Sequence, residues 1–118
     1  MLWLSTRKVC MPTPVTRGTL LRKLRDAVPF ALVEALGPGY FEDAHLPGAV
    51  NIPAGQVDRL APKLLPDMTA EVVVYGTATD TSAAMVARRL AELGYESVSV
   101  YAGGKEEWIE HGLPVERP

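Results

Sequence analysis

Three short, mostly apolar runs alternate with segments of helical pattern, and this alternation limits the chain to a parallel α/β architecture. The runs cover residues 30–35, 71–75 and 97–101. Such runs, without regular polar alternation, are typical of strands buried on both faces of a sheet. A strand followed by a helix and another strand forms a parallel pair with a right-handed crossover. The sequence therefore predicts a central, mainly parallel sheet in three layers, with helices on both faces.

The helices before, between and after these runs are predicted from apolar spacing and capping residues. The strongest pattern covers residues 82–93, where one face carries Ala83, Val86, Ala87, Leu90 and Leu93. A first helix begins after Thr16, a good N-cap residue, and continues to about Val28. Shorter helical segments are expected at 40–44, at 57–65 with an interruption by Pro62, and at 105–111.

The domain organisation follows from length and proline placement. The chain has 118 residues, which suits one domain. Pro12 and Pro14 argue against regular structure near the start. We therefore expect an N-terminal extension over residues 1–14 and a single domain over residues 15–118.

Composition excludes several classes of protein. The net charge of −2 gives no basic field for nucleic acid, and the apolar stretches are too short for a membrane span. One cysteine, Cys10, cannot form an internal disulfide, which favours a reducing, cytoplasmic location. Two histidines and one cysteine, far apart in sequence, predict no metal site, and no motif indicates a cofactor.

The junction after the run at 71–75 is the corner at which a parallel α/β protein usually binds ligands. Backbone N–H groups converge there, and the start of the following helix favours an anion. The loop and its flank consist of Gly76, Thr77, Ala78, Thr79, Asp80, Thr81 and Ser82. Glycine cannot act as a nucleophile, and no histidine is evidently placed in the sequence to activate a loop hydroxyl.

Two groups of motifs resemble the rhodanese-like domain family over about residues 13–118. Residues 44–49 read AHLPGA and are followed by NIP at 51–53, while 93–95 read LGY and 112–115 read GLPV. The positions that match the family, and for which we expect structural roles, are His45, Pro47, Gly48, Gly103, Gly104 and Trp108. For His45 the resemblance implies a hydrogen bond that fixes its loop.

The family's loop resembles C-x-x-G-x-R-S, and its cysteine carries sulfur as a persulfide taken from donors such as thiosulfate. Here Gly76 replaces the cysteine, Thr79 the glycine and Thr81 the arginine. The family also commonly has D-x-R after its first buried strand, where this chain reads EAL at 34–36. The resemblance thus implies the sulfurtransferase fold without its nucleophile.

Charged side chains near the loop have structural interpretations as well. Asp80 places a negative charge where an anion would bind, and we expect Asp80, or else Thr81, to cap the helix that opens at Ser82. His111 suits the negative end of a helix dipole. The glutamates between residues 106 and 110 are expected to form a solvated helix face.

Three hypotheses follow. The first is a binding or regulatory module that contacts another protein through residues 76–81 and 45–49. The second is a sulfurtransferase that uses Cys10 or a partner's cysteine. The third is a binder of small ligands at loop 76–81, through its amides and threonine hydroxyls.

Overall fold

The protein is described by a computed structural model, in which residues 12–117 are placed. A five-stranded sheet runs through its centre in the order β1-β5-β4-β2-β3, and every neighbouring pair is parallel. The strands are β1 (Thr13–Val15), β2 (Ala31–Glu34), β3 (Val50–Asn51), β4 (Glu71–Tyr75) and β5 (Ser97–Tyr101). The predicted α/β fold with a parallel sheet is confirmed.

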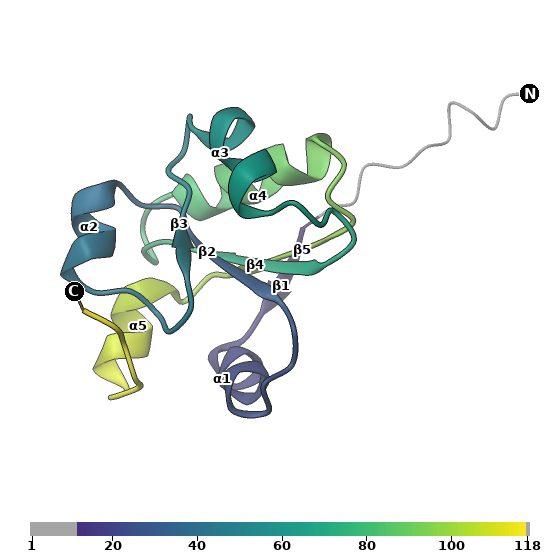
Figure 1. Ribbon diagram of the computed structural model, residues 1–118. Helices are drawn as coiled ribbons and strands as arrows, with labels where there is room; N and C mark the ends of the chain where they lie inside the picture. The colour runs from purple at the N-terminus through teal and green to yellow at the C-terminus, as the bar shows by residue number, and fades with distance from the viewer. Residues whose placement is uncertain (1–11, 118) are drawn as a thin grey trace, which may run out of the picture.

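Helices cover both faces of this sheet. Figure 1 shows α3 and α4 on one side and α1 and α5 on the other, with α2 beside the sheet near α5. The helices are α1 (Arg17–Arg25), α2 (Pro38–Asp43), α3 (Val57–Leu64), α4 (Ser82–Glu92) and α5 (Gly104–Glu110). Thr16 caps α1, as predicted, by accepting a hydrogen bond from the backbone N–H of Thr19.

The two faces of β4 belong to two separate cores. Val72 and Val74 pack with the buried face of α4, whereas Val73 and Tyr75 pack with Trp108 of α5. All four of these side chains are fully buried. A strand covered on both faces needs apolar residues at every position, which is why residues 72–75 lack a polar alternation.

Three local predictions are wrong. Pro14 lies within β1, which pairs with β5; an edge strand tolerates proline because its outer side needs no N–H donor. Pro62 lies within α3, where the helix loses one backbone hydrogen bond and continues to Leu64. The first helix ends at Arg25, because Ala27 adopts a left-handed backbone with a φ of 53°.

The topology places one loop in the middle of the sheet's carboxyl edge. From β2 the chain goes to β3 at one edge, and from β4 it goes to β5 on the other side. Connections that leave neighbouring parallel strands in opposite directions create the crevice in which α/β proteins bind ligands. Residues 76–81, between β4 and α4, follow a strand at this switch point of the strand order.

Candidate functional site

Gly76 is the first residue after β4, and it is buried. A Cβ atom placed there would lie 3.5 Å from the backbone nitrogen of Ala83 and 3.6 Å from Cδ2 of Leu36. These are ordinary van der Waals distances, and the backbone of Gly76 is not in the left-handed region. The fold therefore has room for a Cβ atom at this position, although the chain provides none.

The loop is held against the start of α5 by backbone contacts. The N–H of Lys105 donates to the carbonyl of Gly76 at 2.8 Å. Gly104 has a φ of +75°, and a Cβ there would lie 2.8 Å from both the nitrogen of Ala78 and the carbonyl oxygen of Gly76. Glycine is required at 104, because any side chain would push the loop away.

Two carboxylates accept hydrogen bonds from backbone N–H groups of the loop. Oε1 of Glu106 lies 2.9 Å from the nitrogen of Ala78, and Oδ1 of Asp80 lies 2.5 Å from the nitrogen of Ser82. Hydrogen bonds from the side chain and backbone of Ser82 lower the pKa of Asp80 below its ordinary value. The acceptors at this corner are therefore side chains of the protein itself.

Of the two residues that we predicted as the cap of α4, Asp80 is not the N-cap. The N-cap residue of α4 is Thr81, whose side chain makes no capping hydrogen bond. Asp80 precedes the N-cap by one residue, so its carboxylate reaches the first helical N–H and not those of the second or third residue. The Thr81 hydroxyl instead points along the helix to the sulfur of Met85, at 3.7 Å.

Neither histidine of the chain is bonded to a loop hydroxyl. His45 stacks on Phe41, with ring centroids 3.9 Å apart, and its Nδ1 lies 2.8 Å from the Phe41 carbonyl oxygen. Nδ1 of His111 lies 2.8 Å from the carbonyl oxygen of Glu107. The hydroxyls of Thr77 and Thr79 therefore have no imidazole partner among residues 12–117.

A buried charge cluster lies beneath the loop, formed by Glu34, Tyr75 and Lys105. Glu34 is 0% exposed, and its Oε2 lies 2.9 Å from Nζ of Lys105. The Tyr75 hydroxyl donates to Oε1 of Glu34 at 2.7 Å and accepts from the N–H of Leu46 at 3.1 Å. Burial, and then the neighbouring Glu34, raise the pKa of Tyr75.

Lys105 completes this cluster with two further bonds. Its Nζ donates to the carbonyls of Tyr40 and Ala44, each at 2.7 Å. Three acceptors match the three N–H bonds of an ammonium group, so the buried charge is fully paired. The cluster ties β2, β4, α2 and α5 together below the loop.

Sequence reasoning missed this cluster. We noted Glu34 only for its departure from a family motif, and Lys105 only as a helix residue. A signal was present, because an ionisable residue inside a buried apolar run needs a partner. The partner itself, 71 residues away, leaves no mark in the sequence.

The other matched positions hold the neighbouring loop. The N–H of Gly48, which has a φ of +78°, donates to Glu116, and the indole of Trp108 donates to the Pro114 carbonyl at 2.7 Å. In the sequence, Pro47 lies between Gly48 and His45, whose backbone forms a bridge with Glu116. The segment 45–49 is linked to the loop by the N–H of Leu46, which donates to the hydroxyl of Tyr75, the residue before Gly76.

Three further expectations meet the structure only in part. Cys10 lies outside the described residues. In residues 12–117, no three side chains of His, Cys, Asp or Glu gather in a way that could hold a metal ion. None of the helices in this range is long and apolar enough to cross a membrane.

Comparison with known proteins agrees with this architecture. A family model described as the rhodanese-like domain matches residues 18–111. The rhodanese-like domain of the Alr3790 protein from Anabaena superposes with a TM-score of 0.79 at 26% identity, covering 92% of this chain and 81% of that one. A thiosulfate sulfurtransferase from Pseudomonas aeruginosa gives 0.79 at 25% identity, covering 89% of this chain and 20% of that one.

A curated relative comes from a different class of protein. The HTH-type transcriptional regulator Rv0324 of Mycobacterium tuberculosis is 35% identical over 103 residues. The match covers 86% of this chain and 44% of the regulator, so this chain spans less than half of that relative.

Proposed function

Since this chain belongs to the rhodanese-like domain family, we propose that it is a member that recognises a partner and does not itself transfer sulfur. The observation that carries this proposal is Gly76. It directly follows β4, at the position where the family resemblance implies a cysteine, and it has room for a Cβ atom but no side chain. No thiol is present in residues 12–117 to replace it.

The state of the loop supports the same proposal. A sulfur donor such as thiosulfate is an anion and would need free N–H groups at this corner. Those of Ala78 and Ser82 already donate to Glu106 and Asp80. Thr81 also supplies no positive charge at the position where the resemblance implies an arginine.

A regulatory role is supported by the type of protein in which a similar sequence occurs. The relative from Mycobacterium tuberculosis is named a transcriptional regulator, and this chain matches 44% of it. We propose that the present domain likewise supplies recognition within a regulatory system. Its contact surface is the exposed part of loop 76–81 together with the neighbouring segment 45–49.

A sulfur-transfer assay tests the absence of catalysis. The intact chain is treated with thiosulfate, and persulfide formation is measured by mass spectrometry alongside thiosulfate:cyanide turnover, for the wild type and Cys10→Ser. We expect no turnover above the background without protein. Turnover that is lost in Cys10→Ser would support the sulfurtransferase alternative, and turnover that persists there would reveal loop chemistry and overturn the proposal.

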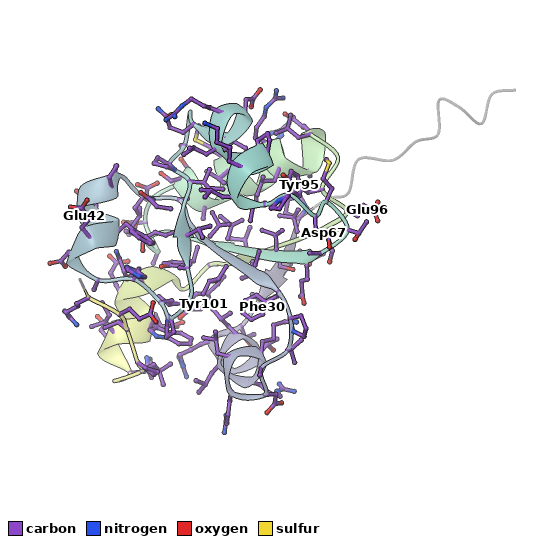
Figure 2. All side chains as sticks on the ribbon, in the orientation of Figure 1. Phe30, Glu42, Asp67, Tyr95, Glu96 and Tyr101 are labelled. Carbon is purple, nitrogen blue, oxygen red and sulfur yellow. The ribbon has the colours of Figure 1, made fainter. Side chains whose placement is uncertain are left out.

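A pair of surface variants tests the recognition surface. Thr79→Arg places a bulky charge on the exposed loop, whereas Glu96→Arg places it before β5, at the opposite edge of the sheet (Figure 2). A partner that co-purifies with the wild type should be lost with Thr79→Arg and kept with Glu96→Arg. Equal retention by both variants would move the contact surface away from the loop.

A further inference from the structure

The first turn of α5 lies in a fixed position against the loop. Backbone atoms of residues 76–78 approach Gly104 so closely that a Cβ there would be 2.8 Å from three of them. The Lys105 N–H also donates to the Gly76 carbonyl. Glu106 follows directly, so its side chain projects from a turn that cannot shift without moving the loop.

From this turn, Glu106 makes the contact that a bound anion would make. Its carboxylate oxygen lies 2.9 Å from the nitrogen of Ala78. A negatively charged acceptor on a backbone N–H forms a charge-assisted hydrogen bond, the same bond by which amide loops hold sulfate or phosphate. Ala78 is an exposed residue, so this hydrogen bond lies at the surface of the protein.

No described cation offsets the negative charge at this place. Within residues 12–117, none of the ion pairs includes Glu106 or Asp80. Lys105 is next in sequence to Glu106, but its ammonium group points inward to Glu34. An incoming anion would therefore meet two carboxylates and two N–H groups that already donate to them.

We propose that Glu106 determines which groups the loop can bind. Its carboxylate accepts the hydrogen bond of the Ala78 N–H, and its negative charge repels anions, so anions are excluded from the loop. This inference deepens the proposed function and rests on it, because it takes the loop to be a recognition surface. Groups that suit this surface are neutral or positively charged, and sulfate, thiosulfate and phosphate do not suit it. Glu106 acts here as a specificity residue and not as a catalyst.

Two variants separate the charge of Glu106 from its hydrogen bond. Glu106→Gln keeps an oxygen that can accept from Ala78 but removes the charge, and Glu106→Ala removes both. Glu96→Gln is the matched control, because it removes the same charge before β5, at the opposite edge of the sheet. Far-UV circular dichroism and thermal melts show whether each variant is folded.

The test is a titration of the ¹⁵N-labelled 118-residue chain with sulfate, followed through the Ala78 amide signal at constant ionic strength. Constant ionic strength is needed because salt screens exposed charges. Wild type and Glu96→Gln should show no saturable shift. Glu106→Ala should bind sulfate saturably and at least about tenfold more tightly than the upper limit that the wild-type titration sets, with Glu106→Gln between the two.

Either of two results would overturn the inference. One is saturable sulfate binding at Ala78 in the wild type. The other is a folded Glu106→Ala or Glu106→Gln that binds sulfate no better than Glu96→Gln. Neither result depends on a measurement of sulfur transfer. The proposed function is contradicted by sulfur-transfer turnover, so the two proposals can fail separately.

Discussion

Two groups of charged side chains lie at the carboxyl edge of the sheet, one buried and one exposed, and they differ in whether each charge has a partner of opposite sign. The buried cluster consists of Glu34, Tyr75 and Lys105. In it the carboxylate of Glu34 faces the ammonium group of Lys105, and each N–H of that ammonium group has an acceptor. The exposed pair, Asp80 and Glu106, accepts hydrogen bonds from the backbone and includes no cation. Full pairing is required only where water cannot solvate the charge.

This difference assigns separate tasks to the two groups. Removing one member of the buried cluster leaves an unpaired charge in the interior, so we expect a large loss of stability. Removing an exposed carboxylate leaves groups that water can solvate, so we expect a small loss of stability and a change in what the loop binds. Substitutions in and around both groups test this division, from the largest expected effect to the smallest.

Lys105→Met should have the largest effect, lowering the free energy of unfolding by roughly 3–5 kcal/mol because Glu34 would remain buried without a cation. The measurement is urea unfolding, followed by circular dichroism. Lys63→Met, at an exposed position of α3, is the control and should change little. A loss below about 1 kcal/mol for Lys105→Met would show that the cluster is solvated and would remove the contrast between the two groups.

Leu90→Ala should lower the free energy of unfolding by about 2–5 kcal/mol, because Leu90 is fully buried between α4 and the sheet. This tests whether apolar packing, and not Asp80, anchors the helix that follows the loop. Met85→Ala, on the same helix and 57% exposed, is the matched control for urea unfolding. Equal effects of the two substitutions would contradict the packing assigned to α4.

Asp80→Ala should destabilise the fold less than Leu90→Ala, since the carboxylate is exposed and satisfies one N–H at the start of α4. The pKa of Asp80 is lowered in the folded state, so its contribution is present above its ordinary pKa and is lost as the pH falls through the folded value. Thermal melts of both proteins should therefore converge in acid. A mutant that melts higher than the wild type, and higher still with sulfate, would make Asp80 a functional carboxylate.

Gly76→Cys should have the smallest effect on stability, because a Cβ there makes only ordinary contacts. We expect its thiol pKa to stay near or above the free value of about 8.5, since the exposed pair is negative and no arginine is present at position 81. Adding Glu106→Gln should lower that pKa. Ultraviolet titration of the thiolate measures both, and a single mutant that titrates well below neutral pH would refute this view of the loop.

Sequence patterns predicted the parts of the fold that depend on local spacing. Residues 71–75 and 97–101 form strands with the expected bounds, because a strand buried on both faces shows itself by continuous apolar residues. Pro14 misled the prediction, since proline is tolerated where an edge strand has no outer neighbour, and edges are known only after assembly.

The site was less accessible to prediction than the fold. The loop itself could be located from the apolar run that precedes it. The bond between Glu106 and Ala78 could not, because it depends on how closely α5 approaches the loop at Gly104. The same holds for Glu34 and Lys105, whose pairing is set by the packing of α5 on the sheet.

Lys105 connects the loop with α2 through hydrogen bonds of its backbone and its side chain. Its backbone N–H holds the loop at Gly76, while its side chain holds the carbonyls of Tyr40 and Ala44 in and after α2. A partner that displaces the loop must therefore also pull on the carboxyl end of α2. The loop and α2 are therefore expected to move together, so binding at residues 76–81 should change the rate of amide hydrogen exchange in residues 40–46.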